Sequence, residues 1–421
     1  MSTIAVVIPC LNEAPNLRIL LPRVHEVVSA FHLPASVWVV DGGSSDGTPA
    51  VAAELGAHVL RQRGSGYGGA IRTAFEDIDA GFLITLDADY SHHPAILKYL
   101  YEAREHADIV IASRYVKEGH AEMAPGRAVL SRILNEVFRR VLSLPVRDLS
   151  SGYRLYRRDV IANLAPEHET YAVLQEILVK AYCEGFQVRE IPFHYLPRKH
   201  GETHARLFRF GMDYLAVLTK MWHLRNGIES ADYDSRAFHS RIPLQRYWQR
   251  KRYRVLLEFI GEALRVLDTG CGSSQLLNGA PQIIGADVQP RKLRFMRRPG
   301  RNLVASSTYA LPFPDESFEV VISSEVIEHI EETPGLFDEL ARCVEPGGVL
   351  IVGTPDYGGW QWPLIERLYK MAKPGGYADE HITHYTFDGL RDRLEARGFT
   401  LEGHRYILGG ELILKARKTG R

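Results

Sequence analysis

The sequence predicts an α/β protein with two domains, each built on a parallel sheet wrapped by helices. Three observations predict this. The chain has 421 residues, 45% of them hydrophobic, and this length exceeds what one hydrophobic core usually serves. Short apolar runs alternate with segments of helical period from the amino terminus onward. The same alternation starts again near residue 264, which indicates a second domain.

The first series of elements ends near residue 113. Hydrophobic runs of strand length are "IAVVIP", "SVWVVD", "AHVLR", "FLITLD" and "DIVIAS". Helical periodicity predicts helices between them, around residues 15–30, 48–55, 67–79 and 94–106. The order of strands and helices is the order that βαβ units require.

The second series contains the strands "LRVLD", "QIIGAD", "FEVVISS" and "GGVLIVGTP", with a helix over 332–345. Before it, the polar stretch "RNGIESADYDSRAFHSR" is poor in aliphatic residues, and "LQRYWQRKRYRVLLEFI" predicts a helix that leads into the second domain. We therefore expect a first domain at residues 1–228, a linker at 229–249 and a second domain at 250–421.

Composition excludes several classes of protein. The 51 basic and 51 acidic residues cancel, which removes the electrostatic argument for a nucleic-acid partner. Four widely spaced cysteines predict reduced thiols in a cytoplasmic protein. The amino terminus lacks a basic signal segment, and no stretch approaches the roughly 18 apolar residues of a membrane span. We expect a cytoplasmic chain whose membrane contact, at the inner face, is peripheral.

Polar side chains follow several strands of the first domain. Asp41, the pair Asp87 and Asp89, and Arg114 all come where an apolar run ends, at the sheet edge where ligands bind. In extended backbone, Asp87 and Asp89 would point to the same side, and two carboxylates suit Mg²⁺ or Mn²⁺ shared with substrate phosphates. The alternative is that Asp89 and Ser91 cap the following helix.

Five motifs of the first half agree in order and spacing with a known family. They are "VVIPCLNEAPNL", "VVDGGSSDGT", "RGSGYGGAIRTAF", "LDADYSHHP" and "SRY". This half resembles the GT-A nucleotide-diphosphosugar glycosyltransferases, and within them the inverting family 2 enzymes that transfer mannose or glucose to polyprenyl or dolichyl phosphate. The stretch "GSGYGG" also fits a dinucleotide fingerprint, but it follows the third strand, so we interpret it as a tight turn into a helix beside the donor site.

The resemblance implies which residues bind the donor. Asp87 and Asp89 would hold the metal on the donor diphosphate, with Asp89 and Arg114 taking part in catalysis. Ser91 stands where relatives have glutamine, which leaves a third protein ligand unsupported. The residues implied to border the nucleotide are Pro9, Leu11, Glu13 and Asp41.

The acceptor is either a phosphate or a hydroxyl. A lipid phosphate is already ionised near neutrality and needs cations and hydroxyls to hold it, and the resemblance assigns Arg114, Arg127 and Ser131 to it. Arg127 and Ser131 are four residues apart, on one helical face. A glycan hydroxyl would instead need a general base, for which Glu176 is the candidate.

A late basic loop continues the resemblance. Arg198 and Gly201 fit the family pattern R-x-x-G-x-S-K, whereas Thr203 and His204 replace its serine and lysine. A polyprenyl acceptor also requires a membrane surface. The residues that could form a peripheral contact are Leu207, Phe208, Phe210, Tyr214 and Trp222, between Arg206, Arg209 and Lys220, although these aromatic side chains could equally pack against the domain.

The second domain opens with the strand and loop "LRVLDTGCGSS", and Asp287 ends the next strand about 20 residues later. These spacings fit either a dinucleotide or an S-adenosylmethionine site. The continuation, with "LPFPDESFEVV" and "EPGGVLIV", resembles the class I S-adenosylmethionine-dependent methyltransferases over about residues 250–405, so both domains are expected to be Rossmann-like.

This second resemblance implies contacts with the methyl donor. Asp268, Gly270 and Gly272 would contact the methionine part, Asp287 the ribose, and the segment that starts at Glu325 would border the donor. Ser307 stands where an acidic residue commonly contacts adenine. Candidate general bases are Glu325, Glu328, His329, His381 and His384, with His329 or His384 preferred, and "HITH" could chelate a metal, although the sequence shows no third ligand for it.

Together the two halves predict a bifunctional enzyme. The first half would transfer a hexose from a nucleotide sugar to polyprenyl phosphate or a glycan, and the second would methylate a compound of the same pathway. The alternative is that one half is a non-catalytic nucleotide-binding or docking module.

Overall fold

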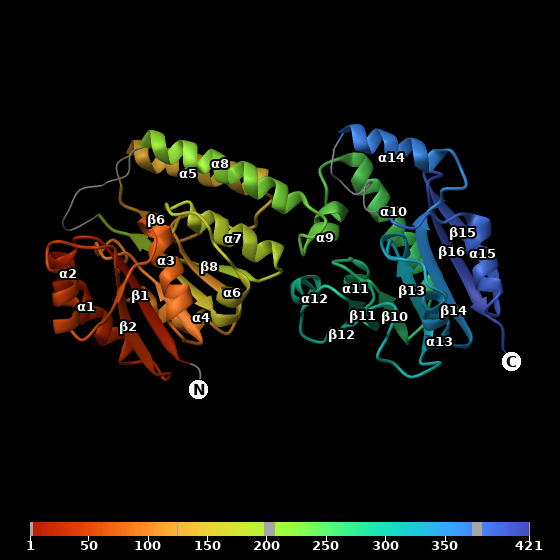
Figure 1. Ribbon diagram of the computed structural model, residues 1–421, viewed down its shortest axis with the longest axis horizontal. Helices are drawn as coiled ribbons and strands as arrows, with labels where there is room; N and C mark the ends of the chain where they lie inside the picture. Colours follow the sequence, from red (N-terminus) through yellow and green to blue (C-terminus); the bar gives the residue numbers. More distant parts are fainter. Residues whose placement is uncertain (1–2, 124, 198–206, 373–380, 421) are drawn as a thin grey trace. The chain divides into compact units, whose positions relative to one another are not determined.

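A computed structural model describes residues 3–123, 125–197, 207–372 and 381–420 (Figure 1). The chain forms two compact units, Met1–Asn226 and Gly227–Arg421. Both are α/β units, as the sequence predicts. Residues 229–249, expected to be a linker, contribute α9 (Tyr233–Phe238) and the first turns of α10 (Pro243–Ile260) to the second unit. Among the described residues, no helix combines enough length and apolar character to cross a bilayer.

The first unit is built on a seven-stranded sheet in the order β3-β2-β1-β4-β7-β5-β8. The strands are β1 (Ile4–Cys10), β2 (Ala35–Asp41), β3 (His58–Arg61), β4 (Phe82–Thr85), β5 (Ile109–Ser113), β7 (Arg154–Arg157) and β8 (Val188–Pro192). The sheet is mostly parallel, as the sequence predicts, but it is mixed at β7, which pairs antiparallel with β4 and β5. The other six strands run in one direction, so their carboxyl ends meet at one edge.

Helices cover both faces of this sheet because side chains alternate along each strand. Ile4, Val6 and Ile8 of β1 face one buried cluster, whereas Ala5 and Val7 face the other. The helices are α1 (Ala14–Val28), α2 (Thr48–Glu54), α3 (Gly66–Asp77), α4 (Ile96–Ala103), α5 (Pro125–Val141), α6 (Arg158–Asn163), α7 (Val173–Cys183) and α8 (Leu207–Asn226). A short parallel pair, β6 (His120–Ala121) and β9 (His194–Tyr195), completes the unit.

The second unit has its own seven-stranded sheet, in the order β12-β11-β10-β13-β14-β16-β15. Its strands are β10 (Val266–Thr269), β11 (Ile283–Asp287), β12 (Leu303–Ala305), β13 (Phe318–Ser324), β14 (Val344–Pro355), β15 (Phe399–Ile407) and β16 (Glu411–Lys418). The four predicted strands are confirmed as β10, β11, β13 and β14. The antiparallel strand β16 was not predicted.

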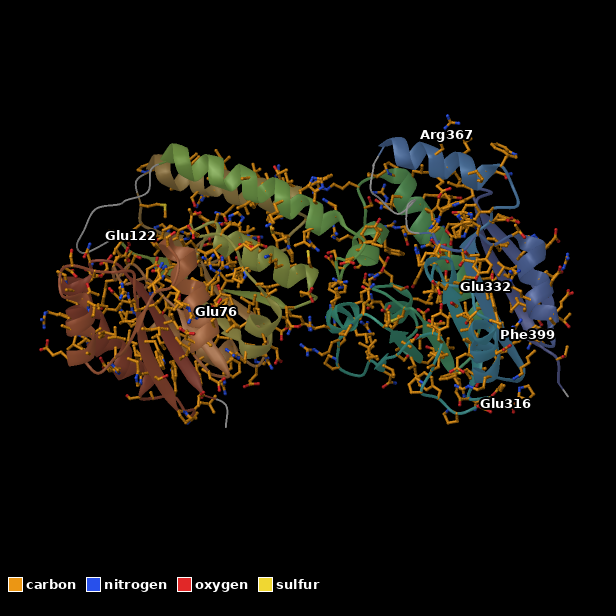
Figure 2. The ribbon with its side chains drawn as sticks, in the orientation of Figure 1. Glu76, Glu122, Glu316, Glu332, Arg367 and Phe399 are labelled. Atoms are coloured by element: carbon orange, nitrogen blue, oxygen red, sulfur yellow. The ribbon has the colours of Figure 1, made fainter. Side chains whose placement is uncertain are left out.

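Two buried clusters line the faces of the second sheet. One includes Leu267, Val321 and Phe399, and the other includes Val266 and Ile322 (Figure 2 labels Phe399). The remaining helices are α11 (Leu276–Gly279), α12 (Pro290–Met296), the 3₁₀ turn η1 (Ile327–His329), α13 (Pro334–Cys343), α14 (Gln361–Ala372) and α15 (Phe387–Glu395).

Candidate functional sites

Carboxylates crowd the edge of the first sheet where β1, β2 and β4 end. Cys10, the last residue of β1, is buried, and burial is the main cause that raises the pKa of its thiol. The carboxylates of Glu13, Asp41, Asp46 and Asp87 raise that pKa further, because a thiolate there would face their negative charge. Segments far apart in sequence therefore concentrate negative charge at one place, as a divalent cation site requires.

β4 ends at Thr85, Asp87 follows it in irregular backbone, and Asp89 lies in a turn. The argument from extended backbone was therefore wrong, since the alternation of a strand does not continue through Asp89. Asp89 is buried, and its Oδ1 accepts hydrogen bonds from the amide and the hydroxyl of Ser91. Tyr90 between them has φ of 64°, a left-handed conformation rare for a non-glycine residue, which shows how sharply the chain turns here.

His92 holds Asp87 in this turn. The backbone amide of Asp87 donates to Nδ1 of His92 at 2.9 Å, and Nε2 lies 3.6 Å from the Asp87 carboxylate. Burial lowers the pKa of His92, and its ring stacks on Tyr153 with centroids 4.9 Å apart. The neutral ring therefore orients Asp87, and the sequence motif "SHHP" gave no sign of this role.

Tyr67 and Gly152 line the space beside Asp87. A Cβ built on Gly152 would lie 2.6 Å from the hydroxyl of Tyr67 and 3.4 Å from Oδ1 of Asp87. The Tyr67 hydroxyl is buried and has no hydrogen-bond partner among the described residues, while its ring stacks on Tyr171 at 4.4 Å. Glycine at 152 thus leaves room for a phenol and a carboxylate to approach each other.

The glycine-rich stretch 64–69 turns into α3, as interpreted from the sequence. A Cβ on Gly68 would come within 1.9 Å of the carbonyl oxygen of His168, so only glycine lets α3 approach the segment 167–170. Glu176 holds this segment from the other side. Its buried carboxylate accepts from the amides of Glu167 and His168 at 3.0 and 2.9 Å and pairs with Lys180 at 2.7 Å.

The residues expected to border the nucleotide lie at the ends of β1 and β2. Pro9 is within β1, and Leu11 is exposed beyond it. Glu13 precedes α1 and accepts from the side chain of Asn16 at 2.6 Å. Asp41 accepts from the backbone amides of Gly43 and Ser44 at 3.0 and 3.1 Å, which shapes the loop after β2.

Arg114 lies in a polar network at the end of β5. Its guanidinium pairs with both oxygens of buried Asp148 at 2.7 and 2.8 Å and donates to Ser150 at 2.7 Å. This pairing lowers the pKa of Asp148 and raises that of Arg114, against the opposing effect of burial on each. Asp148 was not predicted, because it stands 34 residues away in an irregular loop.

The same network reaches α5. The hydroxyl of Tyr115 is 2.7 Å from that of Ser131, and Asn135 bonds to the Ser131 carbonyl oxygen at 2.8 Å and to Ser150 at 3.1 Å. The structure thus links Arg114 and Ser131 through their neighbours. The backbone of Arg127 lies one turn before Ser131 on α5, while Arg198, Gly201 and His204 fall outside the described residues.

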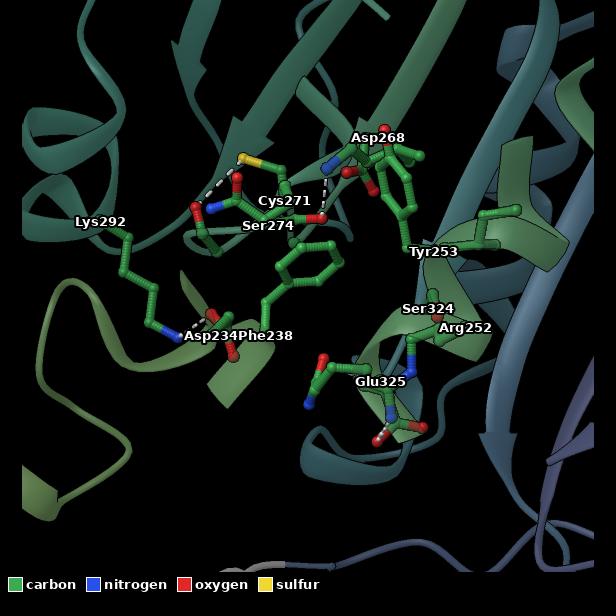
Figure 3. Close-up of a pocket in the computed structure, with 16 residues that line it drawn as sticks. Asp234, Phe238, Arg252, Tyr253, Asp268, Cys271, Ser274, Lys292, Ser324 and Glu325 are labelled. Carbon is green, nitrogen blue, oxygen red and sulfur yellow. Dashed lines mark hydrogen bonds and ion pairs between the residues drawn. The ribbon is translucent and has the colours of Figure 1, made fainter. Parts of the chain in front are cut away.

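In the second unit, a cavity of about 100 Å³ opens at the carboxyl end of β10 (Figure 3). Predicted residues on its wall are Asp268, Gly270, Gly272 and Glu325. Other residues on its wall come from α9 and α10 and were not predicted as site residues; they include Asp234, Phe238, Arg252 and Tyr253. Asp287 and Ser307, which were also predicted to contact the methyl donor, are not among the described residues that line this cavity.

Asp268 carries a strongly perturbed carboxyl group. Burial, followed by repulsion from Asp287 and Asp234, raises the pKa of Asp268 to about 8. Asp287 shapes the adjacent loop, because it accepts from the amides of Gly272 at 2.8 Å and Gln289 at 2.7 Å. An unionised Asp268 at neutral pH would become a carboxylate when a cationic ligand enters, so the cavity suits such a ligand.

Glu325 borders the cavity in a strained conformation. Its φ is 59°, and its carboxylate pairs with Arg252 at 2.8 Å. Arg252 in turn bonds to Glu411, which fixes α10 against β16. Ser307, which the sequence placed near the adenine, forms an isolated antiparallel β-bridge with Ala310.

Comparisons with known proteins follow the division into two units. Residues 5–165 match the family model for glycosyl transferase family 2, and residues 239–404 match that for a methyltransferase domain. The polyprenol monophosphomannose synthase of Mycolicibacterium smegmatis is 36% identical over 211 residues, covering 47% of this chain and 78% of that protein. The undecaprenyl-phosphate mannosyltransferase of Micrococcus luteus is 31% identical over 210 residues, covering 47% and 85%.

Among solved structures, the glucosyl-3-phosphoglycerate synthase of Mycobacterium tuberculosis is 20% identical and aligns with a TM-score of 0.43, covering 53% of this chain and 80% of that chain. The family matches confirm the resemblances that the motifs of the two halves carry.

Proposed function

Since the chain belongs to glycosyl transferase family 2 through its first unit and carries a methyltransferase domain in its second, we propose that it is a bifunctional enzyme. The first unit transfers a hexose from a nucleotide diphosphosugar to polyprenyl phosphate, with inversion at the anomeric carbon. The second unit methylates a compound of the same glycan pathway with S-adenosylmethionine. The two relatives described above are named for mannose transfer to prenyl phosphates, and this supports the proposed acceptor.

The observation that carries the sugar transfer is that Asp87 and Asp89 follow β4 at the sheet edge where the neighbouring parallel strand β1 ends and β2 ends in Asp41. Asp87 and Asp89 would hold Mg²⁺ or Mn²⁺ there, because these ions take carboxylate oxygens and substrate phosphates together. The ion would neutralise the charge that develops on the leaving diphosphate. His92 keeps Asp87 oriented, as its contacts at 2.9 and 3.6 Å indicate.

The acceptor phosphate would bind at the network of Arg114 and Ser131. A buried guanidinium held by Asp148 is pre-oriented, so it loses little conformational freedom when it meets an anion. The phosphate oxygen attacks the anomeric carbon, its bond to that carbon forms as the bond to the donor diphosphate breaks, and no proton needs to be removed from it.

The methyl donor would bind in the cavity at β10. Asp268, Gly270 and Gly272 would face its methionine part, and Asp287 would accept from the ribose hydroxyls. The buried carboxyl of Asp268, with its raised pKa, fits a ligand that carries a sulfonium and an ammonium group. Both charges would favour the ionised carboxylate.

We also propose peripheral membrane contact through α5. One face of this helix exposes a row of apolar side chains at four-residue spacing, which are Val129, Ile133, Val137 and Val141. Arg132, Arg139 and Arg140 lie on the same helix, as expected of a surface that meets anionic lipid. Of the segment expected from the sequence, the side chains at residues 206–214 lie outside the described residues, whereas Trp222 is exposed and Lys220 pairs with Glu167 at 2.7 Å.

The membrane contact is tested by sedimentation with vesicles that contain anionic lipid. Ile133→Asp combined with Val137→Asp should release most of the protein from the vesicles. Val59→Asp, at an exposed valine of β3, is the matched control and should leave binding unchanged. Equal sedimentation of both variants would contradict the proposed surface.

The sugar transfer is tested with UDP-, GDP- and dTDP-hexoses, polyprenyl phosphate and either metal. Asp87→Asn should lower transfer at least a hundredfold and a chelator should abolish it, whereas Asp79→Asn, at an exposed position, should have no effect. Undiminished turnover of Asp87→Asn in the presence of chelator would refute metal dependence. Label from S-adenosylmethionine in the extracted lipid-linked sugar would support the second activity and its pathway.

A further inference from the structure

A second cluster of ligating side chains lies at the carboxyl edge of the second sheet. Glu328 and His329 belong to η1, the turn that follows β13, and His381 comes from a segment beyond α14. One ligating atom from each of the three side chains lies within 4.8 Å of the other two. Tetrahedral zinc with ligands at about 2.0 to 2.1 Å holds its ligand atoms about 3.3 to 3.4 Å apart, so the three atoms need to approach by at most about 1.5 Å, which side-chain rotations can supply.

The backbone builds this cluster. The amides of Ile382 and Thr383 both donate to the carbonyl oxygen of Glu328, at 2.8 and 3.1 Å. The hydroxyl of Thr383 donates to the carbonyl oxygen of Ile330 at 2.9 Å. These bonds fix the segment that carries His381 against η1, so the meeting of the three side chains follows from the fold.

Glu328 points an incompletely satisfied carboxylate into the cluster. Its side chain is fully buried, and Oε2 accepts from the hydroxyl of Thr354 at 3.1 Å. Oε1 is also buried, has no hydrogen-bond partner among the described residues, and lies 4.0 Å from Nε2 of His329. A buried carboxylate oxygen without a donor is costly, and a bound cation would remove that cost.

His381 is held as ligating histidines usually are. Its Nδ1 lies 2.8 Å from the hydroxyl of Tyr357, and metal-binding histidines commonly use their second nitrogen for such a bond. His384, three residues later, is exposed and stacks on the ring of Tyr357 with centroids 4.0 Å apart. The ligating atoms that lie near His381 are therefore those of Glu328 and His329 rather than those of His384.

We propose that Glu328, His329 and His381 form a binding site for a divalent transition-metal ion such as Zn²⁺. Two imidazoles and one carboxylate suit such an ion, and a set of three protein ligands leaves a coordination position open for a further ligand. This site is separate from the one at Asp87 and Asp89, which has no imidazole among its proposed ligands.

The location of the cluster in the fold indicates which ligand would occupy the open coordination position of the ion. Ser324 and Glu325 line the cavity at β10, and Glu328 follows Glu325 by three residues, so the proposed ion would lie next to the wall of the proposed methyl-donor site. This step rests on the proposed use of S-adenosylmethionine. The acceptor is an alcohol, because an ion of this kind lowers the pKa of a bound hydroxyl.

In the proposed step, an ion held by Glu328, His329 and His381 would lower the pKa of the acceptor hydroxyl, whose proton would pass to solvent as its oxygen attacks the methyl carbon. The new bond joins that oxygen to the methyl carbon as the carbon–sulfur bond breaks. Its electron pair stays on sulfur, and S-adenosylhomocysteine leaves as a neutral thioether. Charge balances, since the sulfonium loses its positive charge as the alkoxide loses its negative charge.

Metal binding is measured on the full, untagged chain without methyl donor or acceptor, in an Asp87→Asn, Asp89→Asn background. Titration with Co²⁺, followed by visible absorption, should show one equivalent with nitrogen ligands, and Zn²⁺ should displace it and raise the melting temperature. Glu328→Gln and His381→Ala should each weaken Co²⁺ binding at least tenfold. His384→Ala should bind as the background protein does.

The outcomes separate the alternatives. Loss of binding in His384→Ala with retention in Glu328→Gln would assign the ion to the exposed H-x-x-H pair and overturn the proposal, as would absence of Co²⁺ and Zn²⁺ binding. His329→Ala provides a third test at a partly exposed side chain if Glu328→Gln does not fold. Because no methyl donor is present, failure here would leave the proposed methyltransferase activity standing.

Discussion

Asp234 accepts a hydrogen bond from the backbone amide of Ser273 at 3.0 Å, and this bond ties α9 to the glycine-rich loop after β10. The hydroxyl of Ser273 donates to the same carboxylate at 3.1 Å and accepts from the amide of Asp234 at 3.0 Å. Lys292 lies 3.6 Å from the carboxylate. A segment with the composition of a linker therefore forms part of the wall of the proposed methyl-donor site.

Asp234→Ala should destabilise the second unit and weaken the binding of S-adenosylmethionine. The substitution leaves the amide of Ser273 without its acceptor, which costs about 1 to 3 kcal/mol. Denaturant unfolding and calorimetric titration measure the two effects. Asp338→Ala, which breaks an exposed ion pair with Arg397, is the control and should change neither by much. A fully stable Asp234→Ala protein with unchanged affinity would contradict this role.

Binding of S-adenosylmethionine should release a proton from Asp268. Burial raises the pKa of Asp268 from 3.8 to about 8, so the folded protein carries this proton at pH 7 and loses it to a cationic ligand. Affinity should therefore rise as the pH increases from about 6 to 8. Calorimetry at pH 7 in two buffers of different ionisation enthalpy should report nearly one proton, and Asp268→Asn should report none.

The same raised pKa predicts how stability depends on pH. Between pH 3.8 and about 8 the folded state binds a proton at Asp268 that the unfolded state has lost. The contribution of Asp268 to stability is therefore greatest below pH 3.8, falls as the pH rises through this window, and is constant above about 8. Asp268→Asn should remove this fall in stability. If the variant keeps the pH profile of the original protein, Asp268 is not the cause of the fall.

Gly152→Ala should impair sugar transfer, and Tyr67→Phe should partly restore it. The added Cβ would lie 2.6 Å from the hydroxyl of Tyr67, a distance that real Cβ atoms do not show, and it would displace the ring toward Asp87 or away from it. Without the hydroxyl, the nearest ring atom is Cζ at 3.5 Å, an ordinary contact. Rates of the two single variants and the double variant test this. A double variant slower than Gly152→Ala would refute the steric account.

Glu176→Gln should lower stability more than it lowers the rate of sugar transfer. The buried carboxylate accepts from two backbone amides and pairs with Lys180, and an amide in its place turns one acceptor into a donor. We expect a loss of about 1 to 3 kcal/mol in unfolding free energy, with the turnover number of the folded enzyme within tenfold of the original. A collapse in rate with stability intact would favour a hydroxyl acceptor with Glu176 as base.

Asp148→Asn should destabilise the first unit by about 3 to 5 kcal/mol at pH 7, because it leaves the buried Arg114 without its counter-ion. The pairing lowers the pKa of Asp148 below its ordinary 3.8, so its contribution is present above that pH and is lost as the pH falls further. Unfolding curves of the two proteins should converge below about pH 4. Asp77→Asn, which removes an ion pair with the exposed Arg63, is the control. Its unfolding curves should not show this pH-dependent convergence with those of the original protein.

Local patterns in the sequence predicted much of both units. Apolar runs predicted most of the parallel strands, because an element buried on both faces must be apolar along its whole length. The residues that follow such runs, Asp41 and Asp268 among them, could be assigned to a ligand-binding edge for the same reason. The motifs also indicated the protein family of each unit, and the comparisons confirm both assignments.

The antiparallel strands β7 and β16 escaped prediction. β7 has only four residues, and it enters the sheet between β4 and β5 only after the chain has passed through α5. Spacing along the sequence reports on hydrogen bonds within an element or a turn. It carries no information about which distant strand will be the neighbour, since that depends on how the whole sheet closes its core.

The sequence by itself determined two α/β units, their families and the acidic residues at the strand ends. Only the tertiary structure decided that Arg114 pairs with Asp148, that Asp234 reaches Ser273 and that His381 meets Glu328. The physical reason is the same in each case. These side chains stand 34 or more residues apart, and they meet because strands that pair in register bring their loops to one edge of the sheet.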